Sequence, residues 1–148
     1  MTFRVLDVII PSFNEEKYVA ECIKSVIKSC EFAGLSQDHY AIFLVDGGSS
    51  DQTLEIALAL GCRNLVVKEN PGRYLANGWN IGIRESDASY LLAMNAHATI
   101  DENYVKACLS YFHDSDTKGK IVGVGGALET LCLTDDNSAR AVALIMGS

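Results

Sequence analysis

Side chains able to bind a ligand follow three apolar runs of the sequence. Asn95 and His97 follow one run, Asp46 follows a second, and Ser12 and Glu15 follow a third. If the runs are strands of a parallel sheet, their carboxyl ends meet at one edge, which is where open α/β sheets bind ligands. A carboxylate there suits the base or ribose of a nucleoside. Taken singly, Asn95 and His97 are more typical of a turn than of a ligand site, and Asp46 is equally typical of both.

The composition is that of one globular domain. The chain has 148 residues, of which 49% are hydrophobic and 21% charged, with a formal net charge of -7. That is enough apolar material for a packed core. The negative charge argues against a nucleic acid partner, because such binding works mainly through neutralised phosphates. A small phosphorylated ligand is still compatible, since helix N-termini or a metal can hold phosphate.

The cysteines and the apolar runs indicate a reducing, aqueous environment. The cysteine count is 5, an odd number, and no C-x-x-C pair occurs, so we expect reduced, mostly buried thiols in a cytoplasmic protein. No apolar run reaches the roughly 18 residues of a membrane-spanning helix, and the N-terminus lacks the layout of a signal peptide. Residues 139–148 stop within an apolar pattern. We therefore expect no membrane contact from this segment and a truncated C-terminus, with the full-length protein at the cytoplasmic face of a membrane as an option.

Strand-like and helix-like patterns alternate along the chain. Apolar, often β-branched runs predict strands at 5–10, 41–45, 65–67, 90–94 and 121–124. The first strand is expected to stop at Pro11, and the strand at 90–94 is expected to be buried. Alternating strands and helices predict βαβ units with right-handed crossovers. The expected fold is therefore α/β, with a mainly parallel sheet and helices on both faces.

The expected helices rest on capping residues and apolar spacing. Caps are predicted at Asn14, at Ser49 with Gln52 as a capping box, and at Asp101. Asp51 is expected to act in the first turn of the second helix rather than on a ligand. The third helix, from about residue 73, is expected to turn its large apolar side chains inward, namely Leu75, Trp79 and Ile83.

Two common nucleotide sites are disfavoured by the glycine pattern. A dinucleotide site needs GxGxxG directly after a strand, but the first strand is followed by PSFN. The only glycine cluster, at 123–126, lies late in the chain and has Leu128 where the third glycine belongs. No P-loop is present either. NAD and P-loop ATP sites are therefore not expected.

Four motifs together resemble a known family. They are VIIPSFNEEKYVAECIKSV, FLVDGGSSDQT, NPGRYLANGWNIGI and YLLAMNAH. In this order and spacing they resemble the nucleotide-sugar half of the GT-A glycosyltransferases of the large inverting family 2, over residues 5–126. The resemblance implies a Rossmann-like GT-A fold and makes residues 1–148 the nucleotide-sugar-binding part of such a domain. The nucleotide-binding residues it implies are Pro11, Ser12, Asn14 and Glu15 around the uridine or ribose, Asp46 on the base, Arg73 near the base or diphosphate, and Asn95 near the ribose.

The sequence departs from that family at its D-x-D motif. The family usually carries aspartates at positions 95 and 97, and the second ligates a divalent metal that bridges the diphosphate. NAHATIDENYV is similar to the succinoglycan-type exopolysaccharide branch, which has D-A-H there, with Asn95 in place of aspartate. The resemblance makes His97 the ligand of a divalent cation, Mn²⁺ or Mg²⁺. A neutral imidazole can ligate Mn²⁺, whereas Mg²⁺ prefers a carboxylate. The lost charge at position 95 predicts weaker metal binding.

The resemblance implies a glycosyltransferase of the hexosyltransferase type. Its donor would be a UDP-sugar and its acceptor a sugar or a lipid-linked sugar, in polysaccharide or glycolipid synthesis. Transfer would invert the anomeric carbon and would need a general base and a metal. Glu129, Asp135 and Asp136 do not match the position of the family's base, so none is assigned. This chain alone is expected to bind donor without completing transfer.

Two other functions remain open. A non-catalytic nucleotide-binding or interaction module on the same fold is favoured by the neutral Asn95. A nucleotidyltransferase of similar build is a weaker alternative, because no glycine-rich, lysine-containing loop follows the first strand. The sugar, the acceptor and the oligomeric state are not specified by these residues.

Overall fold

The computed structural model describes residues 4–114 and 119–129 of the chain. The chain divides into two compact units, Met1–Ala107 and Cys108–Ser148, and the sheet belongs to the first. Asp135, Asp136 and the terminal stretch 139–148 lie outside the described residues. None of the helices within the described ranges is long and apolar enough to cross a membrane.

The strand expected at 121–124 is not formed. No strand is present among the described residues of the second unit, and Val122 is fully exposed. A strand needs a neighbouring strand to pair its backbone N–H and C=O groups. The described residues provide no such partner for 121–124. Apolar, β-branched residues alone are therefore not enough to make this segment a strand.

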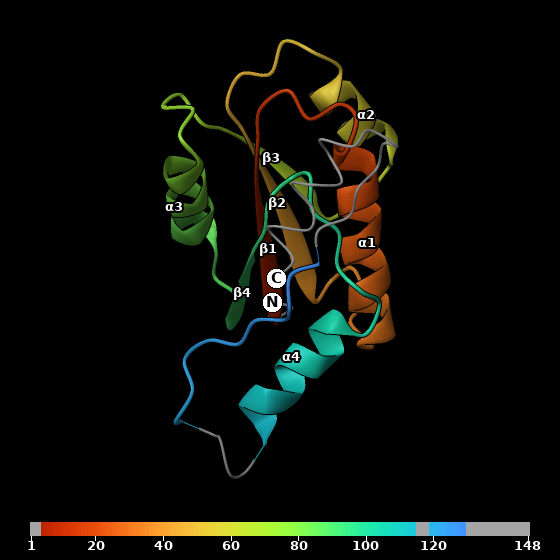
Figure 1. Cartoon of the computed structure of the whole chain (residues 1–148), viewed down its shortest axis with the longest axis vertical. Helices are drawn as coiled ribbons and strands as arrows, with labels where there is room; N and C mark the ends of the chain where they lie inside the picture. The colour runs from red at the N-terminus through yellow and green to blue at the C-terminus, as the bar shows by residue number, and fades with distance from the viewer. Residues whose placement is uncertain (1–3, 115–118, 130–148) are drawn as a thin grey trace. The chain divides into compact units, whose positions relative to one another are not determined.

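Four parallel strands form one sheet in the first unit, in the order β3-β2-β1-β4. The strands are β1 (Leu6–Ser12), β2 (Tyr40–Asp46), β3 (Leu65–Glu69) and β4 (Tyr90–Ala93). The helices are α1 (Val19–Phe32), α2 (Thr53–Ala59), α3 (Leu75–Glu85) and α4 (Tyr104–His113). α1 and α2 lie on one face of the sheet and α3 on the other (Figure 1). The predicted α/β fold, with a parallel sheet and helices on both faces, is confirmed.

The core sits on the two central strands. All residues of β1 and β2 are buried, which explains their nearly continuous apolar sequence, since both faces of these strands are covered. Ile9 and Phe43 pack with Trp79 of α3. The expectation of a buried strand at 90–94 is wrong for one face, because β4 is an edge strand of this sheet and Leu91 is 47% exposed.

Pro11 does not end β1, which continues to Ser12. The carbonyl of Ile9 accepts a hydrogen bond from the N–H of Met94, just after β4, at 3.1 Å. Ile9 therefore faces β4, and so do the backbone groups of Pro11, because residues two apart in a strand face the same neighbour. β4 has already ended at Ala93 on that side. The N–H that proline lacks is therefore not needed in the ladder, and a strand tolerates proline at such a place.

The caps expected at Asn14 and Ser49 are not formed, because these side chains bond to nearby loops instead. α1 and α2 begin without a side-chain hydrogen bond from their N-cap residues. Asn14 bonds to the loop after β2, and Ser49 donates to Asp46 rather than capping α2. Asp51 accepts the N–H of Thr53 at 3.0 Å, which places it at the start of α2 as predicted. Asp101 accepts the N–H of Asn103 at 2.9 Å, and α4 begins only after it.

The buried face of α3 consists of glycines rather than the predicted Leu75 and Ile83. Those two side chains are 46% and 47% exposed, whereas Gly78 and Gly82 are the buried residues of the helix. A Cβ atom on Gly82 would overlap Cγ2 of Ile9 and lie 2.9 Å from its Cγ1. The helix therefore approaches β1 so closely that only glycine fits, and the spacing of large apolar residues indicated the wrong face.

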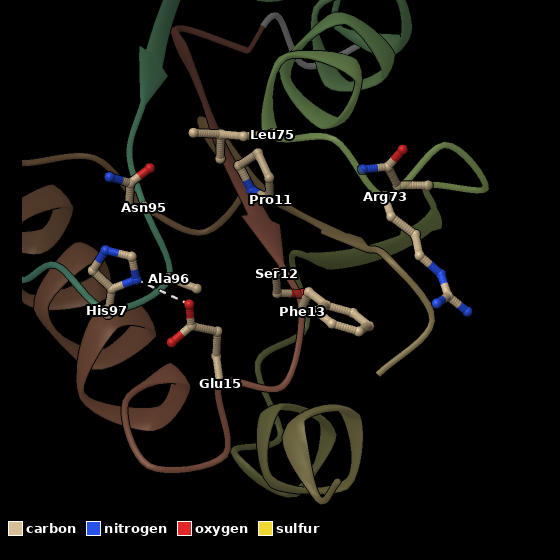
Figure 2. A pocket seen from close by; sticks show the side chains of 10 residues that line it. Pro11, Ser12, Phe13, Glu15, Arg73, Leu75, Asn95, Ala96 and His97 are labelled. Carbon is tan, nitrogen blue, oxygen red and sulfur yellow. Dashed lines mark hydrogen bonds and ion pairs between the residues drawn. The ribbon is translucent and has the colours of Figure 1, made fainter. Parts of the chain in front are cut away.

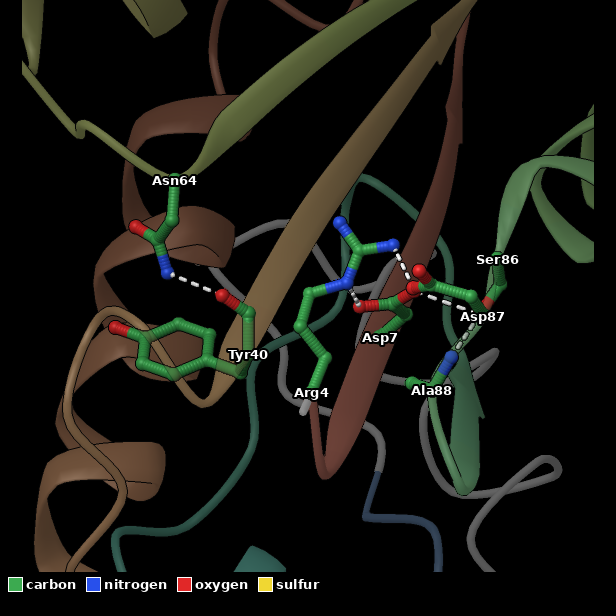
Figure 3. A network of polar contacts seen from close by, with 7 residues as sticks. All are labelled: Arg4, Asp7, Tyr40, Asn64, Ser86, Asp87 and Ala88. Atoms are coloured by element: carbon green, nitrogen blue, oxygen red, sulfur yellow. Dashed lines mark hydrogen bonds and ion pairs between the residues drawn. The ribbon is translucent and has the colours of Figure 1, made fainter. Parts of the chain in front are cut away.

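A polar network lies around the amino end of β1 (Figure 3). Asp46 and Asn95 lie at the other, carboxyl ends of the strands. Asp7 is fully buried, and its Oδ2 accepts the hydroxyl of Ser86 at 2.6 Å. Nε of Arg4 lies 3.2 Å from Asp7 Oδ1. Burial raises the pKa of Asp7, against the hydrogen bond from Ser86 and the charge of Arg4. We assign this network a structural role.

The stability of an Asp7→Asn variant relative to the wild type should depend on pH. Because the pKa of Asp7 is raised in the folded chain, folding favours its protonated form. That stabilisation is fully present below the pKa of the aspartate in the unfolded chain, about 3.9, and is lost as pH rises through its pKa in the folded chain. Asparagine does not titrate, so the free energy of unfolding of the variant should gain on that of the wild type as pH rises above about 4. Denaturant titrations measure this. A constant difference would contradict the raised pKa, and Glu55→Gln, at an exposed position of α2 outside the network, is the control.

Candidate functional site

One pocket opens at the carboxyl ends of the strands (Figure 2). It has a volume of about 190 Å³ and is formed by β1 and the segments that follow β1, β3 and β4. The residues that line it are Pro11, Ser12, Phe13, Glu15, Asn70, Arg73, Leu75, Asn95, Ala96 and His97. Parallel strands bring these distant segments to the same edge of the sheet, where ligands bind in open α/β folds.

Most residues predicted to bind nucleotide or metal line this pocket. They are Pro11, Ser12, Glu15, Arg73, Asn95 and His97. Asn14 and Asp46 are not among the lining residues. Both residues form hydrogen bonds within the adjoining loops and therefore lie beside the pocket. The contact of each of these residues with a nucleotide stays a prediction.

Asp46 ends β2 and organises the loop that follows it. The residue is 5% exposed. Its Oδ2 accepts the N–H groups of Gly48 at 2.9 Å and Ser49 at 2.8 Å. Its Oδ1 accepts the hydroxyls of Ser12 at 3.1 Å and Ser49 at 2.5 Å. This is the turn that the sequence alone equally allowed, and an ionised carboxylate, which only accepts hydrogen bonds, satisfies all these donors.

Asn14 ties the loop after β1 to the loop after β2. Its N–H donates to Oγ of Ser49 at 2.9 Å, and its Oδ1 accepts the N–H of Ser50 at 2.9 Å. The φ angle of Asn14 is 55°, a left-handed conformation that asparagine tolerates better than most residues. The two loops beside the pocket are therefore held to each other by short polar contacts.

Arg73 supplies a positive charge to the pocket. It follows the Asn-Pro-Gly turn, and its N–H donates to the carbonyl of Asn70 at 3.0 Å. Its guanidinium lies 5.5 Å from the centroid of the Phe13 ring. Asn70 is buried and bonds through its side chain to the carbonyl of Tyr74 at 3.1 Å and to Asn77 at 2.8 Å. A firmly held turn thus presents an exposed guanidinium, which suits a phosphate group.

Asn95 carries a buried oxygen without a partner. Among the residues described, nothing donates to its Oδ1. Its carbonyl accepts the N–H of Ala98 at 3.1 Å and the thiol of Cys22 at 3.5 Å. Burial, and then the charge of Glu15, raises the pKa of Cys22 to about 12, so the thiol keeps its proton. A buried acceptor left unpaired costs free energy, which marks Oδ1 as a place for a ligand group.

His97 and Glu15 meet at the pocket wall (Figure 2). Nδ1 of His97 lies 2.9 Å from Oε1 of Glu15. The Glu15 side chain is 19% exposed and the His97 side chain 56% exposed. The contact joins the segment after β1 to the segment after β4. The sequence placed both residues in the site but did not indicate that they touch.

The pocket offers part of a metal site. Within 4–114 and 119–129, no group of three or more His, Cys, Asp or Glu side chains could hold a metal ion. The pocket does bring together the imidazole of His97, whose Nδ1 contacts Glu15, and Asn95 with its unpaired amide oxygen. Cations that act on nucleotides keep several waters and take other ligands from phosphates. These residues therefore fit a cation that a diphosphate helps to coordinate.

Four lining residues were missed by reasoning from the sequence. They are Phe13, Asn70, Leu75 and Ala96. Phe13 and Asn70 directly follow β1 and β3, so the rule that ligands bind beyond the carboxyl ends of strands would have found both. Leu75, at the start of α3, and Ala96, after β4, carry no comparable signal, because apolar residues at such places are equally typical of the core.

Two curated relatives are glycosyltransferases or polysaccharide-synthesis proteins. Over 148 residues the chain is 26% identical to the dolichyl N-acetyl-alpha-D-glucosaminyl phosphate 3-beta-D-2,3-diacetamido-2,3-dideoxy-beta-D-glucuronosyltransferase of Methanococcus voltae, which covers 97% of this chain and 44% of the relative. Over 101 residues it is 29% identical to the succinoglycan biosynthesis protein ExoA of Rhizobium meliloti, which covers 66% of this chain and 29% of the relative. The chain thus spans less than half the length of either relative.

Solved structures share the fold. S. aureus TarS in complex with UDP matches with a TM-score of 0.65 and 20% identity, over 86% of this chain and 40% of that one. The mannosyltransferase PcManGT from Pyrobaculum calidifontis, in complex with GDP-Man and Mn²⁺, matches with a TM-score of 0.64 and 20% identity, over 77% of this chain and 34% of that one. The sequence model described as Glycosyl transferase family 2 matches residues 7–140. The chain therefore belongs to glycosyl transferase family 2 and has the GT-A fold.

Proposed function

We propose that this chain forms the donor site of an inverting hexosyltransferase that uses a UDP-sugar in polysaccharide or glycolipid synthesis. The observation that carries the proposal is the convergence of Arg73, Asn95 and His97 with the end of β1 in one pocket. Membership of the family and a structural neighbour in complex with UDP support it. The whole protein would act on a sugar or lipid-linked acceptor in the cytoplasm, at the membrane face.

The proposed roles follow from the chemistry of each group. Ser12, the last residue of β1, and Phe13, which follows it, border the nucleoside, while Asp46 keeps the neighbouring loop in place. Arg73 balances the charge of the diphosphate. His97 would hold a divalent cation, with Mn²⁺ a better match for imidazole than Mg²⁺. Such a cation stabilises the charge of the departing diphosphate when bound.

We assign no general base to this chain. Inverting transfer needs a group that takes the proton of the acceptor hydroxyl. Glu15 is engaged with His97, and both oxygens of Asp46 already accept hydrogen bonds from the loop. Glu129 is exposed in the second unit. We therefore propose that the chain alone binds the donor and that transfer requires groups from the rest of a longer enzyme.

Calorimetry with UDP tests the donor site. UDP should bind the wild-type chain, and it should bind more tightly when Mn²⁺ replaces a chelator. His97→Ala should abolish the gain from Mn²⁺ while leaving metal-free binding of UDP in place, and His39→Ala, outside the pocket, is the matched control. Absence of UDP binding under both conditions would refute the donor site. A gain from Mn²⁺ that survives His97→Ala would refute the metal role of His97.

A non-catalytic nucleotide-binding module is the second candidate, and the neutral Asn95 favours it. A single assay separates it from the enzyme. The full-length protein is incubated with a UDP-sugar and acceptor saccharides or lipid phosphates, and release of UDP is measured. UDP release that depends on an acceptor supports the transferase, whereas tight UDP binding without release supports the module.

A further inference from the structure

The contact between Glu15 and His97 determines which ring nitrogen of the histidine carries a proton. The two atoms, Nδ1 of His97 and Oε1 of Glu15, are 2.9 Å apart, within hydrogen-bond distance. An ionised carboxylate can only accept hydrogen bonds. Nδ1 must therefore be the donor. In a neutral imidazole this leaves the lone pair on Nε2.

The free nitrogen is the one available to a ligand. Figure 2 shows Nδ1 directed at Glu15 and the other ring nitrogen pointing away from it, on the side of Asn95. The His97 side chain is 56% exposed, so Nε2 has room for a partner. Ring orientation and tautomer are thus both set by one carboxylate.

Glu15 is itself held from two helices. Its N–H donates to Oγ1 of Thr53 at 2.7 Å, and its carbonyl accepts the N–H groups of Tyr18 and Val19, both at 2.9 Å. Thr53 is fully buried and donates to Asp51 Oδ1 at 2.5 Å. Hydrogen bonds to Thr53 and Glu16 lower the pKa of Asp51, although desolvation, the largest single effect, acts in the opposite direction. Contacts with α1 and α2 therefore fix the backbone of Glu15, and the carboxylate of this residue contacts His97.

We propose that Glu15 is a positioning residue that holds His97 in its Nδ1–H tautomer and presents Nε2 to the divalent cation of the donor site. The pair thereby supplies an oriented nitrogen ligand from the segment that follows β4. Histidines that bind metals almost always donate their other N–H to a carboxylate or carbonyl, and loss of that partner typically weakens metal binding by about 10- to 100-fold. The metal part of this proposal rests on the proposed function above, whereas the tautomer does not.

The first experiment reads the tautomer in the metal-free chain. Long-range ¹⁵N–¹H correlation spectra of the histidine ring, at a mildly alkaline pH where imidazole is neutral in general, distinguish the two forms. The wild-type chain should show His97 with the proton on Nδ1. Glu15→Ala should move the proton to Nε2, and Glu21→Ala, on an exposed part of α1, should change nothing. A wild-type chain in the Nε2–H form would overturn the proposal without the need for any variant.

The second experiment measures Mn²⁺ binding in the presence of UDP, by electron paramagnetic resonance of the free ion. Glu15→Ala should weaken Mn²⁺ binding by about 10- to 100-fold, and Glu15→Gln, whose amide keeps one acceptor oxygen, should weaken it less. Wild-type affinity in both variants would overturn the positioning role. If the wild-type chain bound neither UDP nor Mn²⁺, the proposed function would fail, while the tautomer measurement would still decide the role of Glu15 toward His97.

Discussion

An Asn95→Asp variant should bind Mn²⁺ in the presence of UDP about tenfold more tightly than the wild type, or better, a gain of about 1.4 kcal/mol or more. The amide oxygen of Asn95 is buried and has no partner among the described residues, and Asn95 lines the pocket, so a carboxylate at this position would add the charge that a divalent cation favours. Affinity for hard cations rises with the charge of the ligand set. Isothermal titration of Mn²⁺ into the UDP-saturated chain measures the gain.

The same substitution should lower stability when no metal is present. A carboxylate buried without a partner is unfavourable, so the metal-free variant should melt below the wild type, and Mn²⁺ with UDP should raise its melting temperature more than that of the wild type. Asn80→Asp is the control, since residue 80 is exposed on α3 and does not line the pocket. Equal Mn²⁺ affinity in Asn95→Asp and wild type would place residue 95 outside the metal site.

Gly82→Ala should destabilise the fold by about 1 to 3 kcal/mol. At an exposed helical position the same change would stabilise the chain by up to about 1 kcal/mol, because glycine is a poor helix former. Here the new Cβ would overlap Ile9 Cγ2 and lie 2.9 Å from Cγ1. Both atoms belong to a residue of the central strand with no exposed surface, so neither can move aside easily. Chemical denaturation measures the loss.

A double-mutant cycle with Ile9→Ala identifies the cause of that loss. Truncation of Ile9 removes the atoms that a Cβ on Gly82 would meet. Each single variant should be destabilised, and the double variant should be more stable than the sum of the two effects predicts, because the new methyl group occupies part of the cavity. Simple additivity would show that the close contact between α3 and β1 is not the source of the effect.

The glycine face of α3 also connects the fold to the pocket. A Cβ on Gly78 would lie 2.8 Å from Cβ of Pro11, and Pro11 lines the pocket. The close approach of α3 to β1 therefore fixes one wall of the site, and Leu75 at the start of the same helix lines it as well. Substitutions on this face are expected to affect UDP binding together with stability.

The positions of the strands could be predicted from the sequence, with errors only at their ends and at 121–124. Central strands of a parallel sheet are covered on both faces, so β1 and β2 appear as uninterrupted apolar runs. The start of the third helix was predicted to within about two residues, but its buried face was predicted wrongly. Periodicity counts large apolar side chains, whereas the distance between α3 and β1 makes Gly78 and Gly82 the residues that pack.

The sequence by itself determined the order of strands and helices, the membership of the family, and the edge of the sheet at which the polar residues gather. These follow from local patterns and from motifs in a fixed order, which need no knowledge of distances in space. Only the tertiary structure decided how the polar groups are used: Asp46 and Asn14 hold the loops, Asn95 keeps an unpaired oxygen, and Glu15 bonds to His97. The partners of Asn14 and Glu15 lie far from them along the chain. The parallel pairing of β1 with β2 and β4 brings them within hydrogen-bond distance.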